Sequence, residues 1–120
     1  MKIAICPGSY DPVTYGHLDI IKRSAVLVDK LIVTVFVNPS KKTSLFSIEE
    51  RLDMLRETTK DIPNVEVDTS TGLLNVYAAS KNCHLLIRGL RAFSDFEYEF
   101  QRALMIKKID PTLETAFFMT

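Results

Sequence analysis

The sequence lacks the features of several large protein classes. It has only two cysteines, Cys6 and Cys83, far apart in apolar segments, so we expect buried thiols rather than a disulfide framework or a metal knuckle. No apolar run approaches the roughly 20 residues that a membrane-spanning helix needs. The apolar start of the chain reaches Pro7-Gly8 too early for a signal peptide. We therefore expect a cytoplasmic protein without a membrane segment.

The chain also lacks net charge. Its 15 basic and 15 acidic side chains cancel, so no overall field draws it to nucleic acid or to an anionic membrane. Any phosphate binding must therefore come from local groups of cations. With 120 residues, of which 47% are hydrophobic, we expect one compact domain spanning residues 1–120.

Several well-known functional motifs are absent as well. The sequence has no G-x-x-x-x-G-K-[ST] loop and no G-x-G-x-x-G after its first predicted strand, which argues against a P-loop enzyme and a G-x-G-x-x-G dinucleotide binder. Neither a Ser-His-Asp set nor an HExxH motif appears. Nucleotide chemistry, if present, must use another kind of site.

What the sequence does contain is an alternation of strands and helices. Apolar and β-branched runs predict strands over 3–6, 31–37, 65–67, 84–87 and 115–119. Helical spacing of apolar residues predicts helices from 17 onward, from 47 onward, over 72–81 and over 93–108, the second opened by a Ser47–Glu50 capping box. This order predicts an α/β fold with a Rossmann-like, doubly wound, five-stranded parallel sheet and helices on both faces.

The first candidate site residue is His17. Ligands of an open α/β sheet bind beyond the carboxyl ends of its strands, and His17 follows the first strand at the N-terminal turn of a helix. Amide hydrogens and the helix dipole favour phosphate there, and Gly8 and Gly16 allow close approach of the backbone. A lone histidine at such a place is more often a structural cap residue. The glycine-containing loop and the cations after other strands favour a phosphate site.

Cations and glycines also follow the later strands. Lys41 and Lys42 come after the second strand, where two lysines are usually a solvated loop pair. Gly72-Leu73-Leu74 follow the third strand, and such leucines are more often core than pocket. Arg88-Gly89-Leu90-Arg91 follow the fourth, and guanidinium groups placed directly after a buried strand suit bidentate phosphate recognition. We therefore expect phosphate-binding groups along one edge of the sheet.

Three acidic residues, Asp95, Glu97 and Glu99, follow these arginines on the long predicted helix. They could be salt-bridge partners of the arginines. Glu99 could equally bind a ribose hydroxyl. The residues themselves leave both readings open.

Several segments together resemble a known family. The segment 7–17 (PGSYDPVTYGH) resembles the signature of the nucleotidyltransferase superfamily that carries the (H/T)xGH motif. SKK at 40–42, GLL at 72–74, IRGLRA at 87–92 and DFEYE at 95–99 narrow the resemblance to the bacterial phosphopantetheine adenylyltransferase family. It covers essentially the whole chain. The TxGH element alone is shared with other adenylyl- and cytidylyltransferases, whereas the block over 87–99 is far more specific.

The resemblance implies a reaction and a set of site residues. Members of this family transfer the adenylyl group of ATP, with Mg²⁺, to 4′-phosphopantetheine, and give dephospho-coenzyme A and pyrophosphate. His17 would be the catalytic residue, stabilising the transition state at the α-phosphate. The acceptor would be held by Ser9, Lys41, Leu74 and Arg88. ATP would be held by Ser9, Tyr10, His17, Gly89, Leu90, Arg91 and Glu99.

The resemblance also implies a homohexamer that binds dephospho-coenzyme A or coenzyme A as product or feedback ligand.

Two features of this sequence depart from the family pattern. Where the family carries an asparagine near position 106, this chain has Ile106. The family also continues past the fifth strand into a serine-rich, ATP-binding loop and C-terminal helices, whereas the sequence given ends at Thr120. We therefore expect either a fragment or a shortened relative. A nucleotide-binding module without catalysis, or another adenylyl- or cytidylyltransferase, remains the alternative.

Overall fold

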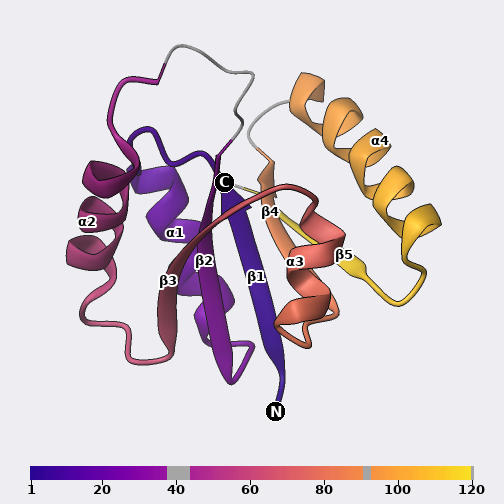
Figure 1. Ribbon diagram of the computed structural model, residues 1–120, viewed down its shortest axis with the longest axis horizontal. Helices are drawn as coiled ribbons and strands as arrows, with labels where there is room; N and C mark the ends of the chain where they lie inside the picture. Colours follow the sequence, from indigo (N-terminus) through magenta and orange to yellow (C-terminus); the bar gives the residue numbers. More distant parts are fainter. Residues whose placement is uncertain (38–43, 91–92, 120) are drawn as a thin grey trace.

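The computed structural model describes residues 1–37, 44–90 and 93–119 of the chain, without the side chains of residues 93–95. Strands and helices alternate along it (Figure 1). The strands are β1 (Ile3–Gly8), β2 (Lys30–Val37), β3 (Val65–Thr71), β4 (Leu85–Leu90) and β5 (Glu114–Met119). The helices are α1 (Tyr15–Ala25), α2 (Ile48–Thr59), α3 (Leu74–Ser80) and α4 (Phe93–Ile109).

The strands form one sheet in the order β3-β2-β1-β4-β5, and every neighbouring pair is parallel. The predicted five-stranded parallel sheet is therefore confirmed. The chain builds outward from β1 through β2 to β3, and then crosses to the other side of β1 with β4 and β5. This reversal makes a switch point between the carboxyl ends of β1 and β4. Open α/β sheets bind their ligands in the crevice at such a point.

Helices cover both faces of the sheet, which confirms the doubly wound arrangement (Figure 1). On one face, α1 and α2 pack on the sheet through a cluster that includes Ile21, Leu55 and Val33. On the other face, α3 packs on the sheet through a second cluster that includes Tyr77, Ile32 and Leu86, with Ile106 of α4 against its edge. The alternation of side chains along each strand thus supplies two cores. None of the helices in the described ranges is long and apolar enough to cross a membrane.

Three strands run further at their C-terminal ends than the sequence predicts. β1 continues through Pro7 and Gly8, because both residues stay in register with β2. β3 runs on through the polar segment 68–71, which pairs with β2 along its whole length. As an edge strand with exposed positions, β3 does not need apolar side chains there. β4 extends to Leu90 because it stays paired with β5. Arg88, Gly89 and Leu90 therefore belong to β4 itself, and the prediction that they follow the end of the strand is wrong.

The helix ends are set by local chemistry. The Ser47–Glu50 capping box at the start of α2 is confirmed by reciprocal hydrogen bonds of 3.2 and 3.0 Å. α3 is shorter than the predicted range 72–81. Gly72 has a φ of +92°, in the left-handed region that favours glycine, and Leu73 is extended, so the helix begins only at Leu74.

Candidate active site

His17 lies in the first turn of α1, directly after the carboxyl end of β1. Thr14 is the N-cap, and its side chain accepts a hydrogen bond of 3.3 Å from the backbone N–H of His17. The His17 side chain reaches back, and its Nδ1 accepts a bond of 3.0 Å from the backbone N–H of Thr14. Because a backbone N–H can only donate, Nδ1 carries no proton. The neutral imidazole then has its proton on Nε2, so this nitrogen is a hydrogen-bond donor.

The Tyr10 ring packs against the His17 ring. The Tyr10 side chain is only 2% exposed, and the ring meets the His17 ring edge-on at 4.9 Å between centroids. The hydroxyl donates to the carbonyl oxygen of Cys6 at 2.9 Å, and burial raises the pKa of Tyr10 well above its ordinary value. A Cβ at Gly8 would come within 3.1 Å of the Tyr10 ring, so any larger residue there would press on the ring. The contact of Tyr10 with ATP stays a prediction. Because the Tyr10 ring is buried, such a contact would have to be made by the Tyr10 backbone.

Asp11 joins the loop after β1 to the segment before α2. Its two carboxylate oxygens accept from the backbone N–H groups of Leu45 and Phe46, each at 2.8 Å. Arg51 of α2 is buried and donates to the backbone carbonyl of Ser9 at 3.1 Å. These bonds tie two loops at the same edge of the sheet. The predicted lysines, Lys41 and Lys42, lie outside the described residues.

Arg88 stands on β4, next to β1, and its side chain is 13% exposed. Its Nε lies 3.3 Å from Oε2 of Glu99 on α4, and Glu99 also faces Arg102 at 3.7 Å. Burial lowers the pKa of Arg88, the neighbouring Arg102 lowers it further, and Glu99 opposes the shift. Arginine nonetheless stays protonated in proteins. The structure therefore holds a buried, charged guanidinium at the switch point.

Among the described side chains, Glu99 is the predicted arginine partner that pairs with Arg88. Its Oε2 is buried and has no hydrogen-bond partner among the described residues. The guanidinium of Arg88, at 3.3 Å, is therefore the group that balances its charge. Glu97 is exposed, and the side chains of Asp95 and Arg91 lie outside the described residues. The salt-bridge reading of Glu99 thus holds in this structure. A ribose contact stays a prediction.

The remaining predicted site residues lie along the same edge. Ser9 is exposed directly after β1, and Gly89 and Leu90 are the last residues of β4. Leu74 is half-buried at the start of α3 and packs on the second core cluster, as does Ile106. The structure therefore brings the described site residues to the carboxyl ends of β1, β3 and β4. Their contacts with ligands stay predictions.

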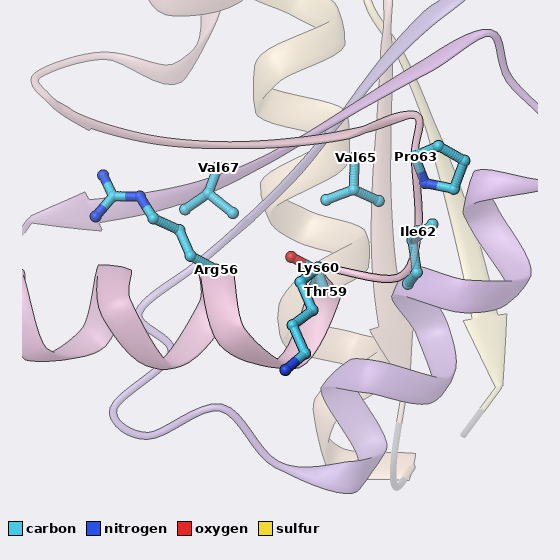
Figure 2. Close-up of a pocket in the computed structure, with 7 residues that line it drawn as sticks. All are labelled: Arg56, Thr59, Lys60, Ile62, Pro63, Val65 and Val67. Atoms are coloured by element: carbon cyan, nitrogen blue, oxygen red, sulfur yellow. The ribbon is translucent and has the colours of Figure 1, made fainter.

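A hollow of about 250 Å³ lies at the other end of the sheet (Figure 2). It is formed where α2 ends and β3 begins, with Val65 and Val67 on the strand side and Arg56 and Lys60 on the helix side. Both cations already pair with acidic neighbours on α2, and the hollow is remote from the carboxyl ends of the strands. It is therefore no part of the candidate site.

Sequence reasoning missed the residues that hold this site in place. Nothing in the segment 9–12 indicates that Tyr10 is buried or that Asp11 binds two amides on another loop. Arg51 and Tyr77 were likewise not singled out. The one available signal was the spacing of Thr14 and His17, which is that of a capping box with histidine in place of glutamate.

Known proteins resemble this chain in sequence and in fold. The cytidylyltransferase-like family model matches residues 5–120. The phosphopantetheine adenylyltransferase of Caldanaerobacter subterraneus subsp. tengcongensis is 62% identical over 120 residues, which is 100% of this chain and 74% of the relative. That of Desulfosudis oleivorans is 58% identical over 120 residues, covering 100% of this chain and 71% of the relative. The chain thus spans about three quarters of the length of these relatives.

Solved structures share the fold at low identity. A lipopolysaccharide core biosynthesis protein from Thermoplasma volcanium superposes with a TM-score of 0.71 at 20% identity, covering 98% of this chain and 96% of that one. A putative nicotinate-nucleotide adenylyltransferase from Vibrio parahaemolyticus gives 0.68 at 16% identity, covering 99% and 74%. At this identity the likeness concerns the fold alone.

Proposed function

Because the chain belongs to the phosphopantetheine adenylyltransferase family, we propose that it transfers the adenylyl group of ATP to 4′-phosphopantetheine, giving dephospho-coenzyme A and pyrophosphate. One observation in the structure supports this proposal most directly. His17, with its Nε2 as a donor, and the buried guanidinium of Arg88 stand on neighbouring elements of the switch point. This arrangement offers a hydrogen-bond donor and a cation where phosphates would meet.

The reaction does not require a general base. The nucleophile is a phosphate oxygen of the acceptor, and a phosphate monoester with a second pKa of about 6 is already largely ionised at neutral pH. That oxygen forms a bond to the α-phosphorus of ATP while the bond to pyrophosphate breaks. Such a transfer needs in-line positioning and groups that face the charge on the phosphorus centre and the leaving group.

His17 suits the first of these tasks. Because Nδ1 is occupied by the Thr14 N–H, the ring is held in one tautomer and one orientation. Nε2–H can then donate to a non-bridging oxygen of the α-phosphate, and this bond strengthens as charge builds on that oxygen. The amide groups of the first turn of α1 add positive potential at the same point. His17 therefore acts as an electrostatic stabiliser, without taking or giving a proton.

Arg88 suits the second task, the binding of the acceptor. Glu99 holds its Nε side, and no other carboxylate of the described residues lies within salt-bridge distance of it. A guanidinium fixed in this way can present its remaining N–H groups to a phosphate. Leu74 would add apolar contact for the pantetheine arm, and Ser9 and Lys41 complete the proposed acceptor site. Gly89, Leu90, Arg91 and Glu99 would line the ATP side.

We propose that magnesium enters as a complex with ATP. The described residues contain no group of three or more His, Cys, Asp or Glu side chains that could hold a metal ion. Mg²⁺ is commonly bound through substrate phosphates and water with few protein ligands, so the phosphates of ATP are the expected ligands. Cytoplasmic location, binding of coenzyme A or dephospho-coenzyme A, and a homohexamer belong to the same proposal through the family.

The experiment that tests this function combines turnover with binding. The purified chain is incubated with ATP, Mg²⁺ and 4′-phosphopantetheine, while pyrophosphate and dephospho-coenzyme A are followed, and ATP binding is measured by calorimetry. We expect both products in equal amounts. ATP binding without any product would instead support a nucleotide-binding module without catalysis.

A further inference from the structure

A polar network lies between α3 and the sheet, on the face opposite His17. The Tyr77 hydroxyl of α3 donates to Asp68 Oδ2 on β3 at 2.6 Å and accepts from the Thr34 hydroxyl on β2 at 3.1 Å. Thr34 is 0% and Tyr77 8% exposed. Lys81, at the C-cap of α3, also reaches Asp68 Oδ2 at 3.3 Å. One carboxylate oxygen therefore holds α3 at two points.

The helix that this network holds has few other means to fix its position. α3 has only seven residues, and its N-cap Leu73 makes no side-chain capping bond. Helices this short are not stable by themselves in water, so tertiary contacts decide where they lie. Besides its hydroxyl bonds, Tyr77 packs edge-on against Phe36 of β2 at 5.3 Å between centroids. Tyr77 is thus the main anchor of α3 on the sheet.

The anchor is close to the proposed acceptor site. Leu74 is three residues before Tyr77, so both side chains lie on the same face of the helix, and both pack on the second core cluster. A change in the tilt of α3 at Tyr77 would move Leu74 relative to Arg88 on β4. The backbone and side chain of Leu74 would then meet the acceptor in a different place.

We infer that Asp68, Tyr77 and Thr34 form a positioning site that sets the affinity for the acceptor by fixing the N-terminal end of α3. The inference rests on the proposed function. It concerns only the acceptor, because the network lies on the face covered by α3. Tyr10 belongs to the core of the opposite face, and His17 lies on α1 against the Tyr10 ring. None of the three residues needs to touch a substrate.

The test compares the Michaelis constants for both substrates in four proteins. Tyr77→Phe removes only the hydroxyl, and we expect the KM for 4′-phosphopantetheine to rise about three- to tenfold, while kcat and the KM for ATP stay unchanged. Asp68→Asn keeps an oxygen that can accept from Tyr77 and should raise the same KM less. Ser80→Ala is the control, since its hydroxyl bonds the Tyr77 backbone outside the network, and we expect no change. Thermal unfolding of each variant checks that it is folded.

The outcomes separate the two claims. A Tyr77→Phe protein with an unchanged acceptor KM, or with both KM values raised alike, overturns the positioning role and leaves the proposed function intact. A wild-type chain that neither binds nor adenylylates 4′-phosphopantetheine overturns the proposed function and this inference with it. An acceptor KM that rises less in Asp68→Asn than in Tyr77→Phe would support the hydrogen bond, rather than the charge, as the anchor, and an equal or larger rise in Asp68→Asn would contradict it.

Discussion

The loop after β1 and the N-terminal end of α3 lie at the same edge of the sheet, but they are fixed in different ways. Within the loop and the start of α1, the Thr14–His17 cap and the buried Tyr10 fix the backbone. The two hydrogen bonds of Asp11 also tie the loop to the segment before α2. The end of α3 has no side-chain cap and depends on the Tyr77 anchor within the helix.

This difference matches two different tasks. Stabilising a transition state requires a donor held within a fraction of an ångström, because a small misplacement costs much of the rate. Binding of a flexible acceptor arm requires less precise placement of the residues that contact it. We therefore expect variants in the first region to change kcat, and variants in the second to change the KM for the acceptor. The following predictions test this division, from the largest expected effect to the smallest.

His17→Ala should give the largest effect, on kcat. Loss of one preorganised donor to a developing oxyanion lowers turnover by about 10²-fold or more. Steady-state pyrophosphate release measures it, with Lys22→Ala on the exposed side of α1 as the control. The fold should persist, because the lost cap costs only about 1 kcal/mol. A folded variant with normal turnover would remove His17 from the chemistry.

Arg88→Lys should act on the acceptor. Lysine keeps the charge but loses the planar fork and the Nε contact with Glu99, so we expect the KM for 4′-phosphopantetheine to rise about tenfold. Initial rates at varied concentrations of each substrate measure this change, and Arg56→Lys on α2 is the matched control. If the KM for ATP rises instead, Arg88 belongs to the nucleotide half of the site.

Asp11→Asn should change stability and kcat together. The amide retains one accepting oxygen, so one of the two backbone N–H groups of Leu45 and Phe46 loses its partner. We expect the free energy of unfolding to fall by about 1–2 kcal/mol. Urea unfolding measures it against Asp53→Asn, which removes an exposed ion pair worth at most about 1 kcal/mol. Equal losses in the two variants would show that the Asp11 link is dispensable.

Asp68 should give the smallest effect, a loss of folding stability at acidic pH. Partial burial acts to raise its pKa, but the hydrogen bonds from Tyr77 and Thr69 and the charge of Lys81 outweigh burial and lower it. A lowered pKa means that the stabilisation is present above the unfolded value of about 3.9 and is lost as the pH falls through the folded value. Urea unfolding between about pH 5 and about pH 2.5 should show this loss in the wild type. Asp68→Asn should lack this part of the acid dependence, and identical curves would contradict the assignment.

Much of the fold could be predicted, because the buried parallel strands are continuous apolar runs. The ends of β3 and β4 could not, since pairing with a neighbour, rather than composition, keeps residues 68–71 and 88–90 in the sheet. For the same reason the sequence pattern ends the fourth strand at Ile87, whereas Arg88 belongs to β4.

The site shows the same limit. His17 and Arg88 could be chosen because their residue types and their places after strands carry a chemical meaning. Asp11 and Tyr77 could not, because their roles depend on partners 34 to 43 residues away that only the folded chain brings close. Tyr10 could be chosen only through the family resemblance, and its burial beneath His17 was not predicted. Polar residues that position a site have no local sequence pattern of their own.

The most direct test of the account is the substrate preference of the wild-type chain. Pyrophosphate release is measured with ATP or CTP, each combined with 4′-phosphopantetheine, glycerol phosphate or nicotinamide mononucleotide. We expect turnover with ATP and 4′-phosphopantetheine well above that of every other pair. Faster turnover with CTP, or with either of the other two acceptors, would contradict it.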